Sequence, residues 1–330
     1  MKKAAVLSIL IVAVLLALGV IAEAQQPGKI PKIGFLGSGL ASASSVTWLM
    51  PFQHEFLKLG YVEGKSIVFV SRHADNEYNR LPALANDLVR LKVDVIVTPG
   101  SNDTRAAKNA TKTIPIVFLG TVSDPVSLGL VDSLARPGGN VTGFTTIGSA
   151  LAGKRLELLK ETIPTLNRVA VLWDPQNEGA KEIWKESQLP AKELGLQLYS
   201  LEVTSADKFS SGFKEAVQAR SDAMAVIGGA LVSSNRKQII QLAAKYRLPV
   251  IYSAGFWVAA GGFISYGHNE GERFTRTAVM VDKILKGTKP ADLPVEQPTK
   301  FEFVINLKTA KQIGVTIPQS LLYRADKVIK

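Results

Sequence analysis

Residues 168–173, Arg-Val-Ala-Val-Leu-Trp, form a short and almost unbroken apolar run, which is typical of a strand that a parallel sheet buries on both faces. Residues 32–37, Lys-Ile-Gly-Phe-Leu-Gly, have the same character in the first half of the chain. A polar or glycine-rich turn follows each run, and then a helical stretch that ends at Leu59-Gly60 or at Leu194-Gly195. Glycine there supplies the left-handed residue that commonly caps a helix. The two runs therefore open two halves built on one plan.

The order of elements continues in parallel through both halves. Further strands are expected at 66–71 and 196–203, at 93–98 and 223–228, and at 114–118 and 248–252, with helices at 81–91 and 209–219 and at 103–111 and 235–246. Strands that alternate with helices in this way indicate parallel sheets. The sequence therefore predicts an α/β protein with two doubly wound, Rossmann-like lobes.

The last part of the chain contains more elements than a simple tandem of two lobes requires. We expect a strand at 263–266, a helix at 270–285 and an alternating strand at 301–305. Lobe 1 is predicted to span 31–145 and lobe 2 to span 146–264, with about 266–290 returning to lobe 1 and about 300–330 returning to lobe 2. Repeated crossings of this kind predict a multi-strand hinge on which the lobes open and close.

The N-terminus has the pattern of an export signal. Lys2 and Lys3 precede an apolar run at 4–22, and Ala22-Glu23-Ala24 provides a small-x-small cleavage site. Residues 1–24 are therefore predicted to be a signal peptide cleaved after Ala24, which predicts a periplasmic protein; the alternative is an uncleaved membrane anchor. The chain has no cysteine, which excludes a lipid-modified N-terminal cysteine, thiol catalysis and cysteine-based metal sites.

Motifs of enzymes and of nucleic-acid binding are missing from the sequence. The net charge is +11, but Lys and Arg are scattered, whereas nucleic-acid binding requires clustering on one face. His54, His73 and His268 lack the paired spacing of metal ligands. No Gly-x-Ser-x-Gly or Walker A motif is present, and the loop 37–42 lacks the third glycine of a dinucleotide site. We therefore predict no enzymatic activity, no cofactor and no metal.

Several longer stretches resemble a known family. They include Leu-Gly-Tyr-Val-Glu-Gly-Lys at 59–65, Arg-Leu-Pro-Ala-Leu-Ala at 80–85, Ser-Leu-Ala-Arg-Pro-Gly-Gly-Asn-Val-Thr-Gly at 133–143, Gly-Lys-Arg-Leu-Glu-Leu-Leu-Lys at 153–160, Asp-Lys-Ile-Leu-Lys-Gly at 282–287 and Leu-Pro-Val-Glu-Gln-Pro-Thr-Lys at 293–300. With these stretches the mature chain resembles the ABC-transporter substrate-binding family that includes the tryptophan-binding TrpX-like proteins. The resemblance implies a type I periplasmic-binding-protein fold and capture of a small solute. It also implies delivery to an ABC permease, and aromatic amino acids are the best-known ligands of the family.

The predicted ligand site lies where the strands end, because open α/β sheets bind ligands beyond the carboxyl ends of their strands. Two facing lobes would place both sets of strand ends along one cleft. From the first lobe the candidates are Ser38, Gly39, Ser101, Asn102, Thr121, Ser123 and Asp124, and from the second Trp173, Asp174, Asn177, Gly229, Ala230, Ser253 and Phe256.

These residue types suit a small zwitterion. Hydroxyls and backbone N–H groups at a helix start such as Ser101 favour a carboxylate, and Asp124 or Asp174 could bind an ammonium group. Trp173, Trp257 or Phe256 could stack on an aromatic or apolar side chain. Each has a structural alternative: Asp124 and Asp174 precede proline and fit helix N-caps, and Trp173 fits a core position. Trp48, in a helical pattern, is expected to serve packing.

The sequence thus predicts a solute-binding protein of an ABC importer. Its ligand is expected to be a small polar molecule, namely an amino acid with an aromatic or branched side chain, bound between two closing lobes. The expected partners are the permease and its separate ATPase subunit, the chain itself is expected to be a monomer, and no nucleic acid is expected. The alternative is a sensor that presents its ligand to a membrane receptor or kinase. A transcription-repressor domain of the same fold would require an N-terminal helix-turn-helix, which the sequence lacks.

Overall fold

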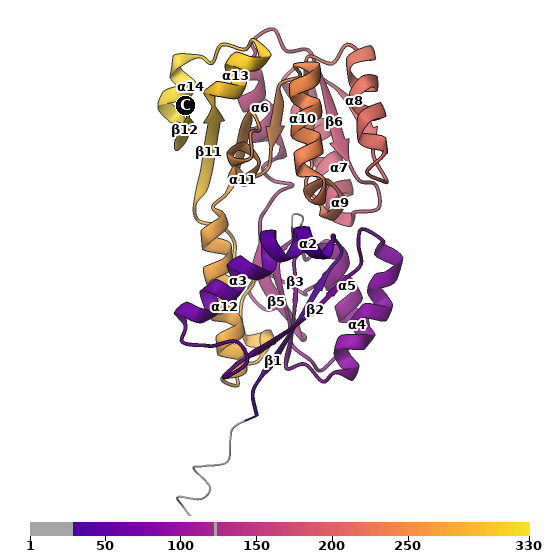
Figure 1. The fold of residues 1–330 in the computed structure, drawn as a ribbon, viewed down its shortest axis with the longest axis vertical. Coiled ribbons are helices and arrows are strands. Elements are labelled where there is room, and N and C mark those ends of the chain that lie inside the picture. The colour runs from indigo at the N-terminus through magenta and orange to yellow at the C-terminus, as the bar shows by residue number, and fades with distance from the viewer. Residues whose placement is uncertain (1–28, 122–123) are drawn as a thin grey trace, which may run out of the picture.

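The structure is a computed structural model that describes residues 29–121 and 124–330. The predicted signal peptide lies outside the described residues. The chain forms two lobes, one above the other in Figure 1, and each lobe has a sheet with helices on both faces. The predicted α/β architecture of two doubly wound lobes is confirmed. Among the described helices, none is both long and apolar enough to cross a membrane.

The first lobe contains a five-stranded parallel sheet in the order β2-β1-β3-β4-β5. Its strands are β1 (Lys32–Gly37), β2 (Val68–His73), β3 (Val95–Thr98), β4 (Ile116–Thr121) and β5 (Val141–Thr145). Helices α3 (Met50–Lys58) and α12 (Glu270–Leu285) cover one face, and α4 (Leu81–Arg90) and α5 (Ser101–Ala110) cover the other. Within β1, Phe35 faces the first pair of helices and Leu36 the second, because successive strand residues point to opposite faces.

The second lobe contains a seven-stranded sheet in the order β12-β11-β10-β9-β8-β6-β7, parallel except between β10 and β11. The strands are β6 (Arg168–Trp173), β7 (Gln197–Glu202), β8 (Ala223–Val226), β9 (Val250–Tyr252), β10 (Ile264–His268), β11 (Phe301–Asn306) and β12 (Lys327–Ile329). On one face lie α6 (Ala152–Thr162), α7 (Glu178–Glu193), α13 (Leu307–Ile313) and α14 (Gln319–Arg324). On the other lie α8 (Lys208–Gln218), α9 (Ala230–Ser234), α10 (Arg236–Tyr246) and α11 (Gly255–Ala259).

The chain passes between the lobes three times. It crosses from β5 to α6, returns from β10 to α12, and crosses again before β11. Backbone hydrogen bonds tie the crossings together: Glu296 N donates to Gly143 O (2.9 Å), and Asn269 N donates to Lys300 O (3.0 Å). Helix α12 therefore packs in the first lobe beside α3, although its neighbours in sequence belong to the second (Figure 1).

Several strands are shorter than expected at their start. β3 begins at Val95 rather than at residue 93, because Lys92 has a left-handed conformation (φ 53°) that ends the preceding helix. In the second lobe Arg247 (φ 49°) precedes β9, which begins at Val250 rather than at residue 248. Arg220 (φ 54°) likewise follows α8, but β8 begins at Ala223 as expected and ends early, at Val226 rather than at residue 228. Glycine most often occupies a left-handed position after a helix. Because Lys92, Arg220 and Arg247 stand there instead, the sequence did not indicate these turns.

Candidate functional site

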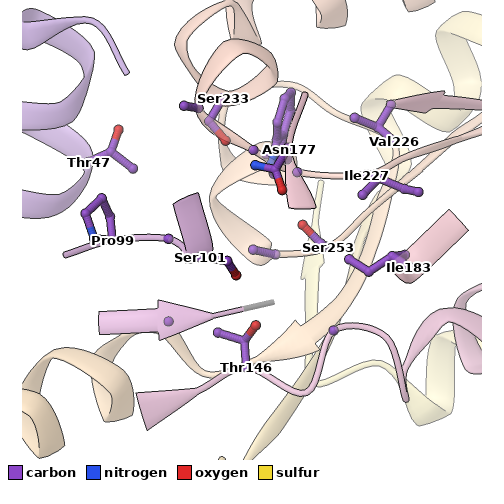
Figure 2. A pocket seen from close by; sticks show the side chains of 18 of the residues that line it. Thr47, Pro99, Ser101, Thr146, Asn177, Ile183, Val226, Ile227, Ser233 and Ser253 are labelled. Atoms are coloured by element: carbon purple, nitrogen blue, oxygen red, sulfur yellow. The ribbon is translucent and has the colours of Figure 1, made fainter. Parts of the chain in front are cut away.

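A cavity lies between the two lobes, at the carboxyl ends of their strands. About 120 Å³ of it is open to the centre of a water molecule. Figure 2 shows Thr47, Pro99 and Ser101 of the first lobe on one side, with Asn177, Ile227 and Ser253 of the second on the other. The cavity sits where parallel α/β sheets usually bind ligands, and residues of both lobes enclose it.

Nine of the fourteen candidate residues line this cavity. They are Ser38, Gly39, Ser101 and Asn102 from the first lobe and Asn177, Gly229, Ala230, Ser253 and Phe256 from the second. Asn177 also caps α7, because its Oδ1 accepts a hydrogen bond from Ala180 N (2.9 Å). Their role in ligand binding stays a prediction.

Trp173 and Asp124 do not line the cavity. Trp173 is buried in the core of the second lobe, where its ring stacks on Trp184 with centroids 5.9 Å apart and its Nε1 donates to Ser200 Oγ (2.9 Å). Asp124 is exposed, and its Oδ1 accepts from Val126 N (2.9 Å). Thr121 ends β4, but its side chain, like Ser123, falls outside the described part of the structure.

Asp174 belongs to a set of contacts that join the lobes. It is buried, and its Oδ2 accepts a hydrogen bond from Tyr78 Oη across the cleft (3.0 Å). Burial raises the pKa of Asp174, opposed in part by the hydrogen bonds from Gln176 N and Tyr78. Asp174 therefore contacts the opposite lobe rather than the cavity.

Two further contacts cross the cleft beside this pair. Asn102 Nδ2 donates to Gln176 O (3.0 Å), and Asn102 Oδ1 accepts from Glu178 N (3.2 Å). Arg105 Nε lies 2.8 Å from both carboxylate oxygens of Glu178. We call Tyr78–Asp174, Asn102–Gln176 and Arg105–Glu178 the rim contacts. They hold the lobes together, so this structure represents a closed arrangement.

Aromatic rings form part of the cavity wall. Phe256 and Trp257 both line it, with ring centroids 5.9 Å apart. Trp48 packs on Phe274, as its helical pattern predicted, and it also lines the cavity, which the sequence did not predict. The guanidinium of Arg273 lies 4.3 Å from the centre of the Trp48 ring, a distance at which a cation is attracted to the ring face.

A buried ionic cluster lines the cavity beside Trp48. Arg273 forms an ion pair with Glu270, and His268 Nε2 lies 3.0 Å from Glu270 Oε1. Burial alone would raise the pKa of Glu270, but the charges of Arg273 and His268 outweigh it, and the pKa falls below its ordinary value. Burial lowers the pKa of His268, with Glu270 opposing the change. At neutral pH the cluster therefore holds one cation and one anion.

Two more charged residues line the cavity. Asp103 in α5 is buried, and burial raises its pKa to about 7, although hydrogen bonds from Ser38 and the Gly100 backbone oppose the rise. Arg155 in α6 is 8 % exposed. Its Nε donates to Tyr266 O (2.8 Å) and its Nη1 to Gly148 O (3.1 Å). Burial lowers the pKa of Arg155 to about 10, which still leaves it protonated at neutral pH.

The sequence did not single out these charged residues for the site. Arg155 lies in the stretch 153–160, which carried the family resemblance, and nothing local distinguishes it from a surface arginine. His268 and Glu270 directly follow the strand expected at 263–266, so the strand-end rule could have included them. Within the described ranges, no three His, Cys, Asp or Glu side chains are grouped closely enough to hold a metal ion.

Residues 50–329 match the family described as ABC transporter substrate binding protein. A tyrosine-binding protein of Clostridioides difficile is 27 % identical over 78 % of this chain and 73 % of its own length. The structure of an ABC domain from Streptococcus pneumoniae in complex with L-Trp superposes with a TM-score of 0.81 at 25 % identity, covering 91 % of this chain and 99 % of that one. A ligand-free, open substrate binding protein with adhesive properties, from Clostridium difficile, gives 0.63 at 26 % identity over the same shares. These likenesses confirm the expected type I periplasmic-binding-protein fold.

Proposed function

We propose, on the premise that the chain belongs to the ABC transporter substrate binding protein family, that it captures an amino acid in the periplasm and delivers it to the permease of an ABC importer. The observation that carries this proposal is the cavity between the two lobes, lined by strand ends from both and bordered by the rim contacts. The ATPase is a separate subunit in this proposal, and the protein acts as a monomer.

The size and chemistry of the cavity support an amino acid. Its volume corresponds to roughly ten water molecules, and an aromatic amino acid has a comparable number of non-hydrogen atoms. The cavity is lined by polar side chains such as Ser101, Asn177 and Ser253 and also by the rings of Trp48 and Phe256, a combination suited to a ligand with one polar and one apolar end. Two relatives are described as binding tyrosine and tryptophan.

The closed arrangement of the lobes supports a proposal in which the permease recognises the ligand-bound protein. The L-Trp complex superposes better than the ligand-free, open structure, with TM-scores of 0.81 and 0.63 at nearly equal identity and coverage. This chain thus resembles the ligand-bound relative more than the open one. In our proposal the ligand shifts the lobes toward this closed arrangement, which the permease then recognises.

A ligand screen tests this function. Residues 25–330 are unfolded and refolded to remove carried-over solute, and melting temperatures are then measured with amino acids, nucleosides and sugars. An amino acid at one hundred times its Kd should add about 2.7 kcal/mol, or roughly 5–10 °C. A selective shift by tyrosine, tryptophan or another amino acid is the expected result. A shift by a nucleoside or sugar alone would contradict the amino-acid proposal.

The rim contacts predict a second effect. Tyr78→Phe removes the hydroxyl that binds Asp174 across the cleft and leaves a buried carboxylate oxygen without this donor, a cost of about 1–3 kcal/mol in the closed state. Because the bond does not form when the lobes separate, ligand affinity should fall about tenfold or more. Calorimetric titration of the variant and of the unchanged protein measures this loss of affinity. Tyr199→Phe is the control, because the hydroxyl of Tyr199 binds Glu215 within one lobe; equal affinities of the two variants would refute a role for the rim.

A further inference from the structure

We propose that the ligand carries a carboxylate group and that Arg155 binds it. This inference rests on the proposed function, because it names the group that the solute presents to the cavity. It also differs from the expectation from sequence, in which the helix start at Ser101 would hold the carboxylate.

The position of Arg155 is fixed by the hinge. It lies in the first turn of α6, directly after the first crossing, and it lines the cavity. Its Nε and Nη1 donate to the carbonyl oxygens of Tyr266 and Gly148, which belong to two different segments near the crossings. Its Nη2 has no hydrogen-bond partner among the described residues. The planar guanidinium is thus held in place with donor capacity left over, which suits recognition of a carboxylate.

Arg155 has no anionic partner in the described structure. Both of its acceptors are neutral carbonyl oxygens, and it forms no ion pair with any described carboxylate. Buried cations are ordinarily paired. The other buried arginine of the cavity, Arg273, has Glu270 as its partner, so that carboxylate is already engaged.

The balance of charges in the cavity lining also favours a ligand with a carboxylate. Its charged side chains are Asp103, Arg155, His268, Glu270 and Arg273. Glu270 balances Arg273, and burial keeps His268 largely neutral. Asp103 is hydrogen-bonded by Ser38 and the Gly100 backbone and forms no ion pair with Arg155 in the described structure. A ligand carboxylate would supply the missing negative charge.

The surroundings of Arg155 indicate what the carboxylate is attached to. Apolar side chains from α6, α7 and the second sheet line the adjoining part of the cavity: Ala152, Leu156, Val171, Ile183, Ile227 and Ile251. These side chains suit an apolar or aromatic body next to the carboxylate. An amino acid has this chemistry, and so does an aromatic acid without an amino group.

The test compares ligands that differ only in the carboxylate. Calorimetric titration of the refolded protein uses L-tryptophan and L-tyrosine, their carboxamides, and the corresponding aryl-propionic acids, which lack the amino group. Each acid that binds should bind at least about 30-fold more tightly than its amide, because the amide leaves the buried guanidinium unpaired. Strong binding of the aryl-propionic acids would identify a simple carboxylate as sufficient.

Variants of Arg155 complete the test. In Arg155→Gln the acid should lose at least about 30-fold in affinity and the preference over the amide should vanish, whereas Arg155→Lys should keep part of that preference through its charge. Arg324→Gln, at an exposed arginine that does not line the cavity, is the matched control. Because Arg155 also supports the hinge, melting temperatures of all variants are recorded, and the acid-to-amide ratio is the deciding quantity, since it compares two ligands of the same folded protein.

Two results would overturn the inference. One is equal affinity of acid and amide for the unchanged protein. The other is a neutral solute, such as a nucleoside or sugar, as the only ligand of the screen; solute capture would then stand while the carboxylate assignment fails. Binding of no solute at all would instead refute the proposed function, and the inference with it.

Discussion

Glu270→Gln should lower the melting temperature of the ligand-free protein by roughly ten degrees. The substitution keeps the shape of the side chain but removes the charge that balances Arg273. This arginine is 2 % exposed, and its guanidinium lies 4.3 Å and 4.8 Å from the ring centres of Trp48 and Phe274. Breaking a buried ion pair from one side costs about 3–5 kcal/mol. Each kcal/mol shifts the melting temperature by about 2–4 °C in a chain of this kind. Calorimetry without ligand measures the loss.

The matched control is Glu161→Gln, which removes the partner of Arg324 in a pair that is 31 % and 46 % exposed. Such a pair contributes about 0–1 kcal/mol, so the control should melt near the unchanged protein. A loss in Glu270→Gln no larger than in this control would show that water or another group already balances Arg273.

The same cluster predicts that acid destabilises the protein. Burial lowers the pKa of His268 in the fold, so the unfolded chain takes up its proton first, and stability falls below about pH 6.5. The pKa of Glu270 is also below its ordinary value, and its contribution is lost at lower pH as the carboxylate becomes protonated. Both effects have the same sign. Unfolding midpoints in urea should therefore decrease from pH 7 to pH 4, and midpoints that stay constant over this range would contradict the prediction.

The fold could be predicted because its signals are local. Runs such as 168–173 are apolar because both faces of the strand are buried, and the stripe at 270–285 corresponds to the bounds of α12, Glu270–Leu285. The boundaries that differed depend on single residues, such as Lys92, whose left-handed conformation nothing in the side chain requires. The rule that ligands bind at strand ends then correctly selected nine residues that line one cavity.

The charged part of the cavity could not be predicted in the same way. Arg155 is positioned by Tyr266 and Gly148, and its surroundings depend on how three crossings of the chain pack together. No spacing in the sequence encodes that arrangement. The two Asp-Pro sites show the opposite case: Asp124 Oδ1 and Asp174 Oδ1 each accept a bond from the N–H two residues later. The sequence had offered a helix N-cap as the alternative to ligand binding, but α7 is capped by Asn177, and residues 125–129, which follow Asp124, form turns and no helix. Both aspartates instead stabilise local turns.

Gly267→Ala should damage both stability and ligand binding. A Cβ atom at this position in β10 would lie 1.8 Å from the carbonyl oxygen of Ser253 and 2.9 Å from its carbonyl carbon. Neither atom belongs to a side chain that could turn away, so the backbone of β10 or the segment after β9 must move. Overpacking of this kind costs about 1–3 kcal/mol or more. Melting temperatures should fall accordingly.

The binding defect follows from what adjoins the clash. Ser253 lines the cavity, and His268 and Glu270 line it directly after Gly267, so a shift of either segment displaces cavity groups. A loss of contacts of about 1.4 kcal/mol raises Kd tenfold, and we expect at least this effect in titrations with the ligand from the screen. Gly139→Ala is the control, because a Cβ there meets no atom within 4 Å. Unchanged affinity in folded Gly267→Ala would mean that the displaced backbone moves away from the cavity, and that Ser253 does not contact the ligand.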